Sequence, residues 1–142
     1  MKKSSKFGFT LIELLVAMTI LAVLMAISLV SYQGAKKSAR DGKRKADLEQ
    51  IRSALEIYRT DCKTYPTSLN FGSPLTGTTE ICAGNTYMEE VPKDPGSCNY
   101  SYTRSGANSY TLCASLEVGG GTVTGCGSCG SGCTCNYKVT NP

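Results

Sequence analysis

The strongest pattern in the chain is an apolar run of 22 residues, Phe9–Val30, in which Glu13 is the only charged residue. A helix rises about 1.5 Å per residue, so this run is about 33 Å long and spans a bilayer core of about 30 Å. The pattern therefore predicts a membrane-spanning helix, to which we assign residues 9–31. A carboxylate at the bilayer centre costs about 2.5–3.5 kcal/mol, so Glu13 requires a counter-charge.

Residues 32–61 predict a second helical segment with a single apolar stripe. Its apolar positions recur every three or four residues, with no proline before Pro66, and they are Leu48, Ile51, Leu55 and Tyr58. We expect one continuous helix from about residue 9 to about residue 61. Its first half is hydrophobic on all sides, and its second half is amphipathic and packs on a sheet.

Residues 62–142 are rich in Thr, Ser, Gly, Pro and Asn, and we assign them to a small disulfide-rich globular domain. Residues 62–97 read as a long loop. Strand-like alternation follows in 99–104 and 109–116, with a hairpin turn between them and a further candidate strand at 136–140. The predicted fold class is α+β, with one long N-terminal helix packed on a small antiparallel sheet.

The eight residues before the apolar run form a short basic leader that contains Lys2, Lys3 and Lys6 and ends in Gly8. Cleavage between Gly8 and Phe9 creates a positively charged amine four residues before Glu13. That amine provides the missing counter-charge, either within one chain or between neighbouring copies. An ordinary secretory signal has a shorter apolar region and an Ala-x-Ala-like cleavage site, which this segment lacks.

The sequence Gly8-Phe9-Thr10-Leu11-Ile12-Glu13, between the basic leader and the apolar helix, closely resembles the type IV pilin and pseudopilin family. The resemblance implies that a prepilin peptidase cuts after Gly8 and N-methylates Phe9, and that Glu13 acts in assembly. Two later segments resemble the major pseudopilins of type II secretion. They are Tyr58–Asp61 with Thr64–Pro66, and the proline-containing loop Val91–Pro95.

The function that this resemblance implies is a structural subunit of a type IV pilus-like surface filament, which we favour slightly, and no enzymatic activity. The alternative is a pseudopilin of a type II secretion or DNA-uptake system. The implied partners are further copies of the chain in a helical filament, prepilin peptidase, an inner-membrane assembly platform and a cytoplasmic assembly ATPase. Before assembly the chain spans the inner membrane with a cytoplasmic N-terminus, and afterwards the filament is extracellular or periplasmic.

The chain contains eight cysteines and no histidine. So many thiols in a small domain suit an oxidising compartment, and the lack of histidine removes the commonest general base, so we predict no catalytic site and no cofactor. Proximity along the chain favours the bridges Cys62–Cys82 and Cys98–Cys113, and two bridges within the tail. A simple hairpin places Cys113 opposite Tyr100, so the second bridge requires a bulge or a diagonal geometry.

The tail holds four cysteines within ten residues, and they are Cys126, Cys129, Cys133 and Cys135. A C-x2-C pair is the usual first half of a tetrahedral zinc site, but the C-x-C that follows is less usual. We favour disulfides and predict no metal. A membrane-anchored thiol or metal-binding protein is the alternative from another functional class. Some pseudopilins bind calcium near the end of the sheet, but Gly119–Gly132 here contains no acid, which argues against such a site.

Six basic residues lie within ten positions of the predicted helix, and they are Lys36, Lys37, Arg40, Lys43, Arg44 and Lys45. We interpret them as contacts to membrane headgroups or as a solvated helix face. DNA capture by an assembled filament is the alternative that we do not favour. Without the leader lysines the chain has 12 basic and 11 acidic residues, a near-neutral balance that does not indicate a general nucleic-acid-binding protein.

Overall fold

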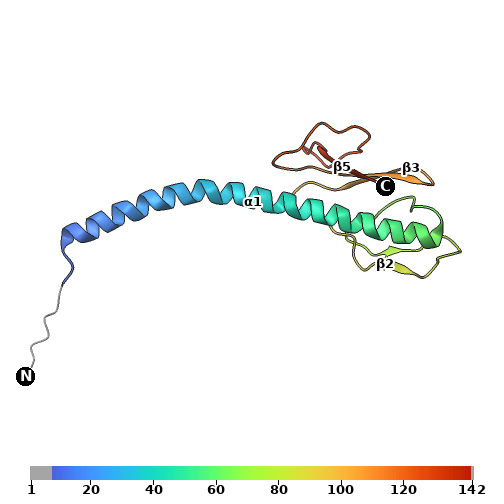
Figure 1. Cartoon of the computed structure of the whole chain (residues 1–142), viewed down its shortest axis with the longest axis horizontal. Coiled ribbons are helices and arrows are strands. Elements are labelled where there is room, and N and C mark those ends of the chain that lie inside the picture. The colour runs from blue at the N-terminus through green and yellow to red at the C-terminus, as the bar shows by residue number, and fades with distance from the viewer. Residues whose placement is uncertain (1–7, 142) are drawn as a thin grey trace, which may run out of the picture. The chain divides into compact units, whose positions relative to one another are not determined.

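The structure is a computed structural model, and it describes residues 8–141. The leader lysines and the rest of residues 1–7 lie outside this range. The described residues divide into two units, one up to residue 36 and one from residue 37. One helix, α1 (Leu11–Cys62), contributes to both units, which confirms the predicted long N-terminal helix (Figure 1). The helix ends where Lys63 adopts a left-handed conformation (φ 61°), and the Lys63 backbone N–H donates to the carbonyl of Arg59 at 2.9 Å.

The second unit contains two antiparallel sheets that flank the C-terminal half of α1 (Figure 1). The smaller sheet pairs β1 (Leu75–Thr76) with β2 (Thr86–Met88). The larger has the order β3-β4-β5, formed by Ser101–Gly106, Ser109–Ala114 and Tyr137–Thr140. The predicted α+β class and the three strands of the larger sheet are confirmed. The smaller sheet lies inside the segment that the sequence predicted to be a loop.

The core of the second unit lies between α1 and the sheets. The helix side is the predicted stripe, Leu48, Ile51, Leu55 and Tyr58, each fully buried. The sheet side includes Tyr110, Leu112 and Ala114 of β4, which alternate toward the helix as expected for a strand. Full burial of a leucine or isoleucine side chain stabilises the fold by about 1.5–3 kcal/mol, so this stripe attaches α1 firmly to the sheet.

The opposite face of the larger sheet is covered by the cysteine-rich segment between β4 and β5. Cys113 faces away from the helix and is nevertheless buried, because it forms a disulfide with Cys126. Gly127 then passes so close to β3 that a Cβ atom there would lie 2.7 Å from the Ser101 hydroxyl oxygen. This segment therefore forms a second cover on the sheet, with a glycine where it passes close to β3.

All eight cysteines are among the described residues and form four disulfides, which are Cys62–Cys82, Cys98–Cys133, Cys113–Cys126 and Cys129–Cys135. The first bridge agrees with the prediction. The prediction of Cys98–Cys113 is wrong, and only one bridge, rather than two, lies within the tail.

The hairpin register explains this correction. A bulge between Arg104 and Gly106 places Cys113 opposite Ser101. Cys98 is three residues farther along, or about 10 Å of extended chain, whereas a disulfide joins Cα atoms at most about 6.8 Å apart. Each of these two cysteines instead bonds to the tail.

Candidate functional site

The first part of the candidate site is the N-terminus of α1, where Thr10 caps the helix. The Glu13 backbone N–H donates to the Thr10 hydroxyl oxygen at 3.3 Å, and the Thr10 hydroxyl donates to the Glu13 carboxylate at 3.5 Å. The first of these bonds is one half of a capping box, whereas the Glu13 carboxylate contacts the Thr10 hydroxyl in place of the Thr10 backbone N–H. A carboxylate in the first helical turn is also stabilised by the helix dipole.

The structure places the predicted site residues next to one another. Gly8, Phe9 and Thr10 precede the helix, and Glu13 lies in its first turn. Phe9 is 84% exposed. The weak contact to Thr10 is the one side-chain bond of the Glu13 carboxylate among the described residues, so this group retains acceptor positions for a further partner.

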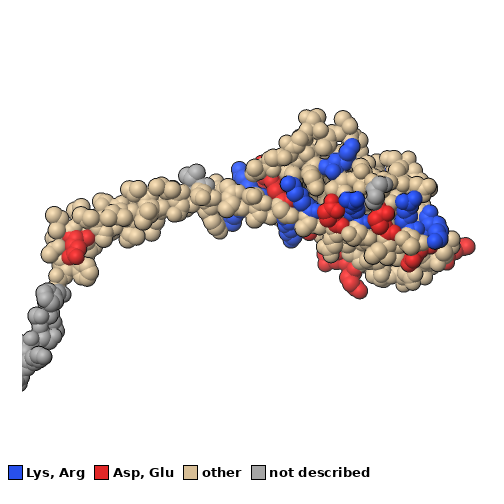
Figure 2. All heavy atoms as spheres, in the orientation of Figure 1, with Lys and Arg blue, Asp and Glu red and all other residues tan. Residues whose placement is uncertain are grey.

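The second part is the apolar surface of α1 in the first unit, which has no packing partner in the chain. Every residue from Leu11 to Leu29 is exposed. Figure 2 shows this stretch without a basic residue and with one acidic patch, which by sequence is Glu13. Within the described residues, α1 is the one helix that is long and apolar enough to cross a membrane by length and composition. A helix that is apolar on all sides requires lipid or other helices around it.

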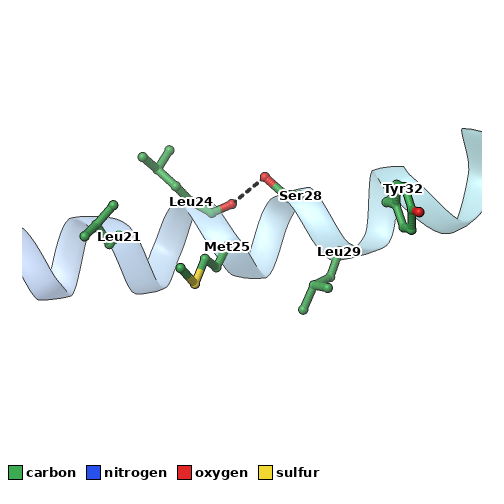
Figure 3. A pocket seen from close by; sticks show the side chains of 6 residues that line it. All are labelled: Leu21, Leu24, Met25, Ser28, Leu29 and Tyr32. Atoms are coloured by element: carbon green, nitrogen blue, oxygen red, sulfur yellow. Dashed lines mark hydrogen bonds between the residues drawn. The ribbon is translucent and has the colours of Figure 1, made fainter.

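Hydroxyl groups within this apolar stretch form hydrogen bonds inside the helix. The Ser28 hydroxyl donates to the Leu24 carbonyl at 2.9 Å (Figure 3), and the Thr19 hydroxyl donates to the Val16 carbonyl at 2.8 Å. Ser28 lines a shallow hollow of about 450 Å³ on one helix face, with Leu21, Leu24, Met25, Leu29 and Tyr32. Because the backbone carbonyls satisfy the hydroxyls, the surface suits an apolar environment.

In the second unit, a buried cation holds the helix to two loops. Arg44 donates both Nε and Nη2 to the Asp94 carboxylate, at 2.7 and 2.9 Å, and its Nη1 donates to Asp41 at 2.7 Å and to Glu117 at 3.0 Å. The side chains of Arg44 and Asp94 are 2% and 0% exposed. Asp94 belongs to the proline-containing loop, so the structural role of that loop is to provide the main carboxylate for Arg44.

Asp41 and Glu117 complete this ionic cluster. The Asp41 carboxylate accepts the backbone N–H groups of Glu117 and Val118 at 2.9 and 2.7 Å. Burial opposes ionisation of Asp41, but these donors and Arg44 outweigh it and lower its pKa. The hydrogen bond from Arg40, with further contributions from Arg44, lowers the pKa of Glu117 to about 2. The sequence did not predict this cluster, although Asp41 and Arg44 have the i, i+3 spacing of a helical ion pair.

The cluster changes the interpretation of the six basic residues. Arg40 and Arg44 are engaged by carboxylates, and Lys36 and Lys45 lie over the rings of Tyr32 and Tyr137. The predicted basic patch therefore divides into two arginines with a structural role and four exposed lysines. A contiguous six-charge surface for DNA is not present.

The cysteines of the tail provide no thiolates in this structure, because all of them are in disulfides. Structural tetrahedral zinc sites use thiolate and imidazole ligands, and the chain has no histidine. Within residues 8–141, no group of three or more metal-ligating side chains comes together. The alternative of a thiol or metal-binding protein therefore receives no support from this geometry.

Comparison with known proteins identifies the family. Residues 3–29 match the prokaryotic N-terminal methylation motif, and residues 31–122 match the model of type II secretion system protein G. The second match covers more than half of the chain. The chain belongs to the type II secretion system protein G family. The resemblance to pilins and pseudopilins is thereby confirmed, and the pseudopilin alternative fits better than the pilus subunit that the sequence slightly favoured.

Individual relatives agree with this family. The type II secretion system core protein G of Vibrio cholerae is 32% identical over 130 residues, which cover 84% of this chain and 89% of that protein. The protein of the same name from Pseudomonas aeruginosa is 29% identical over 130 residues, covering 84% and 92%. No solved structure matches the chain. The family match ends at residue 122, so the four tail cysteines lie beyond it.

Proposed function

We propose that this chain is a pseudopilin, a structural and non-enzymatic subunit of a type II secretion filament. Two observations together carry the proposal. Residues 31–122 match the protein G family. The apolar stretch of α1 from Leu11 to Leu29 has no packing partner in the chain, and its one acid, Glu13, lies at the capped N-terminus of the helix. Within a filament, the apolar surfaces of neighbouring helices cover one another. The outer wall then consists of the disulfide-bonded second unit.

Processing and assembly follow from the helix N-terminus. Prepilin peptidase cuts between Gly8 and Phe9 and methylates the new amine of Phe9. Glu13 of one subunit then pairs with this amine on an adjacent subunit, since its bond to Thr10 is weak and leaves acceptor positions free. Before assembly, the helix anchors the chain in the inner membrane with its N-terminus in the cytoplasm, and the second unit folds where cysteines are oxidised.

Partner proteins provide the driving force, because the sequence has no GxxxxGK[ST] phosphate-binding loop. These partners are the inner-membrane assembly platform and the cytoplasmic assembly ATPase. The periplasm is the expected site of the filament. Deletion of the gene in its host should block release of secreted proteins into the medium. Loss of surface pili with intact secretion would instead favour the pilus subunit.

The decisive experiment combines intact mass spectrometry with substitution of Glu13. The native protein should lack residues 1–8, carry one added methyl group and contain four disulfides. Glu13→Ala should leave membrane insertion and the fold of the second unit intact but abolish assembly. Glu80→Ala, at an exposed acid of the second unit, is the matched control and should assemble normally. Normal filaments from Glu13→Ala would refute the pairing role.

A further inference from the structure

A groove on the second unit remains without a role in the fold. It has a volume of about 520 Å³ and lies between the helix and the segment that contains β2. Its lining residues are Gln50, Ser53, Ala54 and Ile57 of α1, with Tyr87, Met88, Glu89 and Glu90. Ile57 is 58% exposed, which is unusual for a large apolar side chain on the amphipathic half of this helix. The tilted ring contact between Tyr58 and Tyr87, at 5.0 Å, fixes one wall.

The rim of the groove is acidic. Glu89 and Glu90 are adjacent and exposed, and neither forms an ion pair or a hydrogen bond with another described residue. Two neighbouring carboxylates repel each other, so a cationic partner lowers the free energy of this rim. The groove therefore favours an occupant with a narrow apolar surface beside positive charge.

A surface of that kind exists on the same chain, on the exposed side of α1 between residues 38 and 46. At about 100° per residue, the exposed small residues Ser38, Ala39, Gly42 and Ala46 form one stripe. Lys43 and Lys45 flank it on either side, both exposed, whereas Arg40 and Arg44 point to the buried side. Small residues allow close approach of a second backbone. A Cβ atom at Gly42 would meet nothing within 4 Å in its own chain.

We infer that the groove of one copy receives the residue 38–46 stripe of a second copy. Ile57 then packs against the small residues, and Glu89 and Glu90 pair with Lys43 and Lys45. The inference rests on the proposed function and extends it, since it names two surfaces that subunits of the filament use. The two surfaces differ, so the contact is heterologous, and repetition of such a contact gives an open filament rather than a closed dimer.

Two substitutions at Gly42 distinguish the effect of side-chain size on assembly from the effect of a more rigid backbone. Gly42→Ala and Gly42→Leu both replace the glycine with a better helix former, and a Cβ atom at this position meets nothing within 4 Å in its own chain. Only leucine fills the stripe. We expect Gly42→Ala to assemble like the wild type and Gly42→Leu to lose filaments while keeping a folded, oxidised second unit. Equal assembly of the two variants overturns the inference.

Charge reversal tests the rim. Glu89→Lys with Glu90→Lys should reduce the fraction of subunit in sheared filaments by about threefold or more, and Lys43→Glu with Lys45→Glu should restore it. Two matched controls each reverse one exposed charge elsewhere. They are Glu80→Lys, and Lys37→Glu, which lies about 120° around the helix from Lys43. Both controls should assemble normally, and a failure of the combined variant to recover counts against the pairing.

Photo-crosslinking of the full-length protein locates the contact directly. A benzoylphenylalanine at Gln50 is placed in filaments mixed from isotopically light and heavy subunits, so that mass spectrometry separates crosslinks between copies from those within one copy. A light–heavy crosslink to residues 38–46 supports the inference. A crosslink to another segment overturns it but leaves the pseudopilin assignment intact. Failure of the wild type to form any filament contradicts the proposed function itself.

Discussion

The two units of this chain differ in how their apolar side chains are removed from water. In the second unit, apolar side chains are buried within the chain: Leu48, Ile51, Leu55 and Tyr58 are fully buried against the sheets. In the first unit, the side chains from Leu11 to Leu29 are all exposed. The C-terminal half of α1 is therefore covered by the sheets of its own chain. The apolar N-terminal half must be covered by lipid or by other helices. The folding core therefore lies in the second unit, whereas the apolar surface of the first unit depends on surroundings outside its own chain.

Cysteine usage follows the same division. All eight cysteines belong to the second unit, and each of the four disulfides has at least one cysteine outside the helix and the strands. The smaller sheet has strands of two and three residues, and the segment from residue 115 to 136 contains no strand. Covalent links offset the small amount of backbone pairing there.

The largest effect on this comparison should come from breaking the disulfides. Loss of a native disulfide in a small domain costs about 2–5 kcal/mol, so reduction of all four should unfold the second unit. The cysteine-free helix of the first unit should keep its helical circular dichroism in micelles. Among single pairs, Cys98→Ser with Cys133→Ser should cost most, because that bridge has the longest separation, 35 residues, against 6 for Cys129–Cys135.

Urea unfolding of the full-length protein in micelles, with and without reductant, measures this prediction. The near-ultraviolet signal of the tyrosines reports on the second unit, because the aromatic contacts of its core involve Tyr58, Tyr65 and Tyr110. An unchanged unfolding midpoint after complete reduction would show that the apolar core alone holds the second unit together.

The next largest effect should come from core truncation. Leu55→Ala removes a fully buried side chain and should lower the free energy of unfolding of the second unit by about 2–5 kcal/mol. Leu21→Ala removes a similar side chain that is 53% exposed, and it should leave that free energy unchanged. Chemical denaturation followed by tyrosine fluorescence compares the two. Equal destabilisation by both variants would contradict the conclusion that only the C-terminal half of α1 packs within its own chain.

The elements that could be predicted from the sequence are those whose pattern repeats along the chain. The apolar run, the stripe from Leu48 to Tyr58 and the alternation in β4 each involve several residues at a fixed period, so the helix and the larger sheet were predictable. β1 and β2 are too short to show a period. The Cys98 pairing failed because the hairpin turns at Ala107 and Asn108, one residue later than predicted, and its register places Cys113 opposite Ser101, three residues from Cys98.

The ionic cluster could not be predicted for a different reason. Its members come from the helix and from two loops at positions 94 and 117, and their approach depends on the tertiary fold. The sequence shows Arg44 as one of six neighbouring basic residues, and only the fold distinguishes it from Lys43 by burial. In contrast, Gly8, Phe9 and Glu13 were found from the sequence because they form a local pattern. Their roles in processing and assembly remain predictions.

The cluster provides a smaller, pH-dependent effect that is confined to the second unit. The pKa of Glu117 is lowered from its ordinary value of 4.5 to about 2, first of all by its hydrogen bond from Arg40. A lowered pKa in the folded state means that the contribution to stability is complete above pH 4.5 and is lost as the pH falls toward 2. Glu117 is partly exposed, so the effect should be smaller than that of Leu55→Ala.

The variant Glu117→Gln tests this pH-dependent contribution of Glu117. The free energy of unfolding of the variant and of the wild type is measured at a series of pH values. The wild type should lose more stability than the variant between pH 5 and pH 2, and the two should converge at the acidic end. Glu80→Gln, at an exposed acid outside the cluster, is the matched control and should follow the wild type. Parallel curves for Glu117→Gln and the wild type would show that the Arg40 contact does not stabilise the fold.

The smallest effect should come from the helix cap of the first unit. Thr10→Val keeps the shape of the side chain but removes the hydroxyl that accepts the Glu13 backbone N–H, whereas Thr10→Ser keeps the hydroxyl. Loss of an N-cap costs about 1 kcal/mol, so amide exchange at Glu13 in micelles should become about fivefold faster in Thr10→Val and stay unchanged in Thr10→Ser. The second unit should unfold at the same urea concentration in all three proteins, since its core contains no part of this turn. If exchange at Glu13 is equally slow in Thr10→Val, the cap does not order the first turn, and the position of Glu13 for its partner must be set by the neighbouring subunit.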